Sequence, residues 1–249
     1  MGRGSSGISG ANRAGGGGGT TPSGVTYQQF MGMSDTQKYS TIESILDDSN
    51  IKVPSYLDDS DTTKVIYALG MNNATTVVTD AQLDNMQGRE IFRTVYDASP
   101  QITSDMILDQ IRNGEYTQMS GSGGSAHGRA IYFATDFTGS TVYGLGQKNP
   151  MVMRAKINSN ANIRSEASLR RQMNGDSTYQ SSRLNRTLTR KYSEDDMSLY
   201  ALSHGIDGWY SGTYTMMVNR GALTASSQNK SIYSSGTYRA SSWSSAPNR

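Results

Sequence analysis

The stretch GRAIYFATD, residues 128–136, decides the fold of this chain. It begins at the end of a glycine-rich run, SGSGGSAHG, and apolar side chains alternate with small or polar ones from Ala130 to Ala134. Alternation with a period of two, in a segment that holds aromatic and β-branched residues, is typical of a short strand. We therefore expect a flexible loop that leads directly into an aromatic strand.

The composition limits the chain to one folded core with poorly structured flanks. Only 35% of its 249 residues are hydrophobic, 27 are glycine, and the net charge is +2. So small a charge, spread along the chain, predicts no specific nucleic-acid partner and no anionic membrane surface. Without cysteine there is no disulfide framework, zinc-thiolate site or thiol nucleophile. No apolar run approaches the roughly 20 residues of a membrane helix, so we expect a soluble protein.

Both ends of the chain are of low complexity. Residues 1–25 are dominated by glycine and serine, and residues 226–249 are rich in serine. Such segments bury too little apolar surface to offset the entropy of ordering, which predicts two tails. The aromatic side chains of Tyr233, Tyr238 and Trp243 leave open a C-terminal tail that docks on the core.

Between the tails we expect a helical lead-in over residues 26–88 and a core over residues 89–225. In the lead-in, Ser34 is a candidate helix cap, and Asp61 or Thr62 would cap a second helix that stops near Gly70. The core reads as strand, helix, loop and strand, from REIFRTVYD through TSDMILDQIRNG to the aromatic strand. A short helix (FTGSTVYG), a strand (PMVMRAKI), a helical region over residues 165–204 and a hairpin turning at Ser211-Gly212 follow.

The common catalytic signatures are absent from the sequence. There is no phosphate loop and no nucleophile elbow, and the glycines near residue 124 precede a strand instead of joining a strand to a helix. That position argues against a Rossmann dinucleotide site. The two histidines, His127 and His204, lie far apart without the carboxylate spacing of a metal site, so no metal is predicted.

The core instead resembles the NAD-binding domain of ADP-ribosyltransferases, the family of diphtheria-type and arginine-specific toxins and poly(ADP-ribose) polymerases. The first strand carries Arg93 followed by Thr94, and GRAIYFATD is similar to the family pattern Gly-x-Gly-Ile-Tyr-Phe-Ala except at Ala130. Tyr143 follows Tyr132 by eleven residues, with Ser140 three residues before it, as in the polymerase-like branch. The resemblance spans residues 90–223.

This resemblance implies an α+β fold of two small facing mixed β-sheets with flanking helices, and NAD as the co-substrate. Tyr132 and Tyr143 would sandwich the nicotinamide ring, and Ser140 would hydrogen-bond its carboxamide. Nicotinamide in NAD is flat and cationic, so aromatic faces suit it. Arg93, with Thr94 beside it, would fix a ribose hydroxyl or a phosphate, since a guanidinium binds oxyanions through two donors.

One departure from the family concerns the catalytic glutamate at the start of the last long strand. Aligning TYTMMVNRGAL on that strand puts Tyr214 at the glutamate position and Gly212 two residues earlier. The nearest acid upstream is Asp207, and the more remote candidates are Glu115, Glu166 and Glu194. Tyr214 and Asp207 are therefore the two candidates for the catalytic position.

Two functional hypotheses follow. The first is a mono-ADP-ribosyltransferase-like enzyme that transfers ADP-ribose to an unknown protein or other acceptor. The second is a catalytically degenerate relative that serves as a structural or binding protein of a bacteriophage virion, since the ending VNRGAL resembles that subgroup. The expected locations are the host cytoplasm or the virion, and the missing glutamate leaves turnover open.

Overall fold

The computed structural model describes residues 21–54, 57, 60–71, 74–114, 127–186 and 195–233. Eight strands form one mixed sheet: β1 (Thr76–Val78), β2 (Glu90–Val95), β3 (Ile131–Ala134), β4 (Met151–Ile157), β5 (Ile163–Ser165), β6 (Gly208–Ser211), β7 (Tyr214–Met217) and β8 (Leu223–Ser231). The expected mixture of helices and strands is confirmed. The glycine-rich run before His127, with Glu115, lies outside the described residues, as does Glu194.

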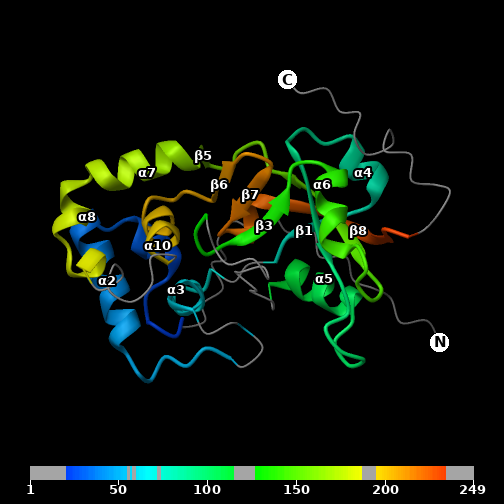
Figure 1. The fold of residues 1–249 in the computed structure, drawn as a ribbon. Coiled ribbons are helices and arrows are strands. Elements are labelled where there is room, and N and C mark those ends of the chain that lie inside the picture. The colour runs from blue at the N-terminus through cyan, green and yellow to red at the C-terminus, as the bar shows by residue number, and fades with distance from the viewer. Residues whose placement is uncertain are drawn as a thin grey trace.

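Helices gather at the two ends of this sheet (Figure 1). At one end lie α2 (Asp35–Asp47), α3 (Asp61–Ala68), α7 (Glu166–Gly175), α8 (Ser177–Ser181) and α10 (Asp195–Ser203), with α1 (Tyr27–Met31) packed on α2. At the other end lie α4 (Asp80–Asp84), α5 (Ser104–Asn113) and α6 (Phe137–Thr141). The short 3-10 helices η1 (Val142–Gly144) and η2 (Arg220–Ala222) complete the described elements.

The sheet has the order β1-β8-β4-β2-β3-β7-β6-β5, and it narrows at its centre. Strands β2 and β4 pair along six residues and β3 and β7 along four, but β2 and β3 pair only at Phe92 and Ala134. All pairings are antiparallel except β1 with β8 and β5 with β6. The sheet thus consists of two groups of four strands that one residue pair joins.

Local sequence signals explain most element boundaries. The Ser34 side chain accepts a hydrogen bond from Gln37 N in a capping box, and Thr103 caps α5, which ends at Gly114 in the left-handed region. These caps confirm the prediction, because short polar side chains satisfy the free N–H groups of the first turn. For α3 the cap is Ser60, one residue before the expected Asp61 or Thr62.

The boundaries of the two expected tails differ from the observed packing. Strand β8 continues to Ser231, six residues into the segment expected to be a tail, and lies between β1 and β4. At the N-terminal side, the Ser23 hydroxyl donates to Ala68 O at 2.6 Å. The Tyr233 hydroxyl accepts from Gly146 N at 2.9 Å, so the docking left open for the aromatic residues occurs at Tyr233. Tyr238 and Trp243 lie outside the described residues.

Gly128 admits the chain into β3 through a position that only glycine fits. Its φ is +96°, and a Cβ there would lie 2.8 Å from Met197 Cε and 2.9 Å from Trp209 Cζ2. Trp209 is fully buried, so the indole has no room to withdraw. The first residue of GRAIYFATD therefore packs directly against the core.

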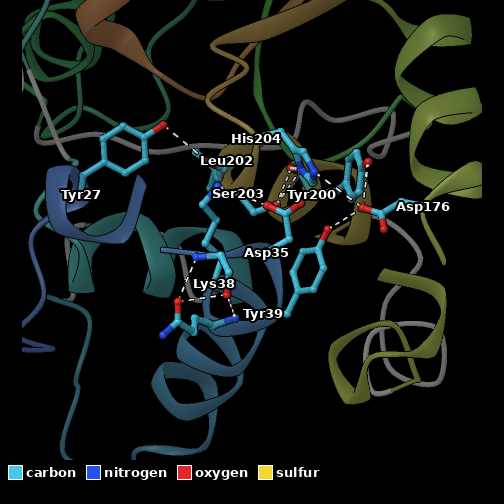
Figure 2. Close-up of polar contacts among 11 residues, drawn as sticks. Tyr27, Asp35, Lys38, Tyr39, Asp176, Tyr200, Leu202, Ser203 and His204 are labelled. Carbon is cyan, nitrogen blue, oxygen red and sulfur yellow. Dashed lines mark hydrogen bonds and ion pairs between the residues drawn. The ribbon is translucent and has the colours of Figure 1, made fainter. Parts of the chain in front are cut away.

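A half-buried aspartate joins the helices at one end of the sheet (Figure 2). Asp176 Oδ2 accepts from the Tyr39 hydroxyl at 2.8 Å and the Tyr200 hydroxyl at 3.3 Å, while Oδ1 accepts from Tyr179 N at 2.9 Å. Burial alone would raise the pKa of Asp176, but these hydrogen bonds outweigh it and lower the pKa below the usual range. Asp176 therefore connects α2, α8 and α10 in its ionised form.

Replacing Gly128 by alanine should lower the free energy of unfolding by about 2–4 kcal/mol, because backbone strain adds to overpacking. Gly212→Ala is the matched control: its φ is +56° but a Cβ there meets nothing within 4 Å, so only strain of about 1–2 kcal/mol is expected. Urea unfolding measures both. Equal losses in the two variants would contradict the close packing at Gly128.

Asp176→Asn should lower stability by about 1–2 kcal/mol at neutral pH, because the tyrosine hydroxyls lose a charged acceptor. A carboxyl whose pKa is lower in the folded state stabilises fully above its unfolded pKa and loses that contribution as the pH falls through the folded pKa. The stability gap between the parent and the variant should therefore close in acid. Thermal melts across pH test this, with Asp47→Asn, which breaks an exposed pair with Arg183, as the control. A gap that persists in acid would contradict it.

Candidate functional site

An arginine bridges the point where β2 and β3 part. Arg93 Nη1 donates to Tyr132 O at 2.7 Å, directly beyond the single pair of Phe92 and Ala134. A strand carbonyl that loses its ladder partner needs another donor, and the guanidinium supplies it. Arg93 and Tyr132, both predicted site residues, thus meet at the narrow centre of the sheet.

Thr94 and Ser140 meet on the opposite face of β2. Successive strand residues point to opposite faces, so Thr94 points away from Arg93. Its hydroxyl lies 2.7 Å from that of Ser140, which is only 1% exposed. Asp136 caps α6 through Gly139 N and thereby fixes the turn that carries Ser140. Ser140, whose hydroxyl is predicted to bind the carboxamide, therefore contacts β2, the strand that carries Arg93.

Tyr143 and Tyr214 form a second contact between distant segments. Their hydroxyl oxygens lie 2.5 Å apart, and the Tyr143 side chain is 49% exposed. Burial and the hydrogen bond with Tyr214 raise the pKa of Tyr143 to about 12, so it is neutral at physiological pH. Tyr214 begins β7 opposite Ala134 and Ser211. The predicted aromatic residue of η1 therefore touches the residue at the expected glutamate position.

His127 and Glu166 extend this cluster. His127 Nδ1 lies 2.7 Å from Glu166 Oε2, and its ring centroid lies 6.0 Å from that of Tyr214. The backbone of His127 is held on both sides, since its N–H donates to the Tyr132 hydroxyl and its carbonyl accepts from Trp209 Nε1. An imidazole and a carboxylate therefore stand beside the two tyrosines.

Glu166 is an ionised carboxylate with little exposure. Its side chain is 14% exposed, and burial alone would raise its pKa. Hydrogen bonds with the Ser211, Arg170 and His127 side chains outweigh burial and lower the pKa below the usual range. Arg170 Nε lies 2.8 Å from Oε1, so the two carboxylate oxygens have separate partners. The cluster thus contains an ionised carboxylate that is paired with the Arg170 guanidinium.

Asp207 lies apart from this cluster. It directly precedes β6, where Gly208 pairs with Met217, whereas Tyr214 pairs with Ser211 at the turn. Four residues of strand separate the two positions along the hairpin, roughly 13 Å. Its carboxylate accepts from Asn162 N at 2.8 Å and Asn219 Nδ2 at 2.6 Å. Asp207 thus holds the loops at the open end of the hairpin, away from the turn.

No pattern in the sequence joins His127 with Glu166. The residue types and spacing indicate His127 only as a possible metal ligand and Glu166 only as a remote candidate for the acid. The two residues are 39 positions apart, and they meet because β5 pairs with β6 in parallel and delivers the start of α7 to the hairpin. Because β5 has only three residues, its pairing with β6 cannot be predicted from the sequence.

Two other features are separate from this cluster. Ser203, His204 and Asp176 form a polar chain like that of a hydrolase triad (Figure 2), with 3.0 Å from Ser203 Oγ to His204 Nδ1 and 3.6 Å from His204 Nε2 to Asp176. Ser203 is fully buried and its hydroxyl donates to Tyr200 O, so no substrate reaches it. A cavity of about 520 Å³ lies along α2, lined by residues such as Thr36, Gln37 and Ile45.

No family model, curated protein or solved structure matches the chain. Among the residues that the structure describes, no three histidine or acidic side chains gather as metal ligands. No helix in the same ranges is long and apolar enough to cross a membrane. The resemblance to ADP-ribosyltransferases therefore stays a prediction from the residues of the site.

The contact between Thr94 and Ser140 should be measurable as a coupling energy. In a double-mutant cycle of Thr94→Val and Ser140→Ala, we expect the single variants to lose about 1 kcal/mol each and the pair to lose less than their sum. Either single change removes one hydroxyl and leaves the other without its partner, whereas the double change removes both hydroxyls together. Urea unfolding of the four proteins gives the coupling, and strict additivity would contradict the contact.

Proposed function

We propose that the chain binds NAD where β2 and β3 part and transfers its ADP-ribose to an acceptor. The observation that carries the proposal is that Arg93, Ser140 and Tyr143, three residues predicted together from the sequence, each make a contact next to the β2–β3 junction. Arg93 bonds to Tyr132 O, Ser140 contacts Thr94 on the opposite face of β2, and Tyr143 contacts Tyr214, which is paired with Ala134 of the junction.

The chemistry of these side chains suits the parts of NAD. The exposed ring of Tyr143 offers an aromatic face to the cationic nicotinamide, with Tyr132 as its expected partner. The Ser140 hydroxyl can exchange its bond with Thr94 for one to the carboxamide. The Arg93 guanidinium, which donates to Tyr132 O through Nη1, has the charge and the planar geometry that suit a ribose hydroxyl or a phosphate oxygen. The finer fold that we infer is two facing half-sheets, since one residue pair joins the two groups of strands.

The proposed reaction breaks the bond between the ribose C1 and the nicotinamide nitrogen. The electron pair of that bond stays with nicotinamide, which leaves neutral, and positive charge develops on the ribose. An acceptor then donates an electron pair to C1 and loses its proton. A fixed negative charge that meets the developing positive charge lowers the barrier more than it strengthens ground-state binding.

A specific observation favours the alternative of NAD binding without turnover. Tyr214, at the expected glutamate position, carries no carboxylate, and its hydroxyl is bonded to that of Tyr143. A neutral group there stabilises the developing ribose cation less than a carboxylate does. A degenerate relative of this kind would serve as a structural or binding protein, with a bacteriophage virion as one proposed setting.

Tyr143→Ala should weaken NAD binding by about 1–2 kcal/mol, roughly 5- to 30-fold in Kd, because a cation loses an aromatic face. Isothermal titration calorimetry with NAD measures this. Tyr210→Ala is the matched control, since Tyr210 is exposed and lies on the other face of the hairpin, in register with Thr215. Tyr233 is unsuitable, because its hydroxyl contacts the backbone of Gly144 and Gly146.

Equal effects of Tyr143→Ala and Tyr210→Ala would remove the basis for the proposed nicotinamide position. Arg93→Ala should also weaken binding, with Arg183→Ala as its control, because Arg183 is exposed and pairs with Asp47 at the helical end of the molecule. Circular dichroism of each variant separates lost binding from lost folding.

A further inference from the structure

We infer that Glu166 supplies the carboxylate that β7 lacks, and that His127 is its positioning residue. The inference rests on the proposed function, because it assigns the acid for that same reaction. It makes the chain an active enzyme in which the acid comes from the first turn of α7 and not from the strand that carries Tyr214.

The geometry brings Glu166 to the start of β7 through two independent contacts. The first is with Ser211, the residue directly opposite Tyr214 in the hairpin, whose side chain is near enough to help lower the pKa of Glu166. The second is His127, whose Nδ1 lies 2.7 Å from Glu166 Oε2 and whose ring lies beside that of Tyr214. Ser211 and His127 therefore each separate Glu166 from Tyr214 by a single side chain. Tyr214 occupies the position at which the family alignment requires an acid.

The charge of Glu166 is suited to this role. A carboxylate accepts hydrogen bonds only, so His127 must carry its proton on Nδ1 toward Glu166. With three polar partners and low exposure, the carboxylate stays ionised in a poorly solvated place. Negative charge acts more strongly on a developing cation where water screens it less. No proton needs to move for this electrostatic effect.

The other described carboxylates near the cluster are already committed elsewhere. Asp136 lies two residues beyond Ala134, the residue paired with Tyr214, but its carboxylate caps α6 by accepting from Gly139 N. Asp207 accepts from Asn162 and Asn219 at the open end of the hairpin. Asp195 is fully buried under α3, where it accepts from the Thr62 hydroxyl and N–H. Glu166, by contrast, lies next to Ser211, which is paired with Tyr214, and next to His127, whose ring lies beside that of Tyr214.

His127 positions Glu166 and is itself immobilised. Its backbone N–H and carbonyl are bonded to Tyr132 and Trp209, and the following Gly128 is locked by packing against Trp209. The ring is thus aimed by the same glycine turn that admits the chain into β3. His127 and Gly128, at the end of the glycine-rich run, therefore position Glu166 as well as the strand that carries Tyr132.

The test measures nicotinamide release from NAD and NAD affinity for the parent, Glu166→Gln and Glu43→Gln. Glu43 lies on α2, far along the chain from the site, and serves as the matched control. We expect Glu166→Gln to lower the release rate by about 100- to 1,000-fold while Kd for NAD changes by less than about threefold, because the charge acts on the transition state. Glu166→Asp, which keeps the charge, should retain part of the rate.

The role of His127 has its own readout in the pH profile. Removing its hydrogen bond in His127→Ala raises the pKa of Glu166, so the acidic limb of the release rate should move to higher pH. A residue that only supported the fold would lower the rate at all pH values without moving that limb.

The outcomes separate the two proposals. If the parent binds NAD but Glu166→Gln releases nicotinamide at the parent rate, the inference fails and the proposed function stands. A parent that binds NAD and releases none also overturns the inference. If the parent binds no NAD, the proposed function fails and the assignment of Glu166 fails with it.

Discussion

The hydrogen bond from Arg93 to the carbonyl of Tyr132 is the interaction on which the rest of the structure depends. It stands where β2 and β3 cease to pair, so a side chain replaces the ladder that would otherwise continue. A buried carbonyl left without a donor is costly, and the guanidinium lets the strands part without that cost. The two groups of four strands can then diverge while the chain remains one hydrogen-bonded sheet.

Around this junction, short capped elements deliver one functional group each. Asp136 starts α6 and so brings Ser140 onto Thr94, and η1 then presents Tyr143 to Tyr214. The parallel pairing of β5 with β6 delivers Glu166 from the other side. An arginine thereby stands where the strands part and a carboxylate stands beside the hairpin.

The sequence predicted those parts of the fold whose signals are local. The alternation in GRAIYFATD, the helix between Thr103 and Gly114 and the hairpin at Gly212 depend on nearest neighbours, and each is observed. Strand β8 escaped prediction because TASSQNKS is polar; its order comes from pairing on both sides with β1 and β4. Glu166 escaped for the same reason, since tertiary pairing alone brings it to His127. Asp207 had the better position in the sequence but lies at the wrong end of the hairpin.

The most direct measurement of the central claim is a crystal structure of the chain grown with NAD. The account predicts the nicotinamide ring against Tyr143, with its carboxamide on the Ser140 hydroxyl and the ribose between Arg93 and Glu166. NAD bound elsewhere, for example in the cavity along α2, with the contact between Tyr143 and Tyr214 undisturbed, would contradict it.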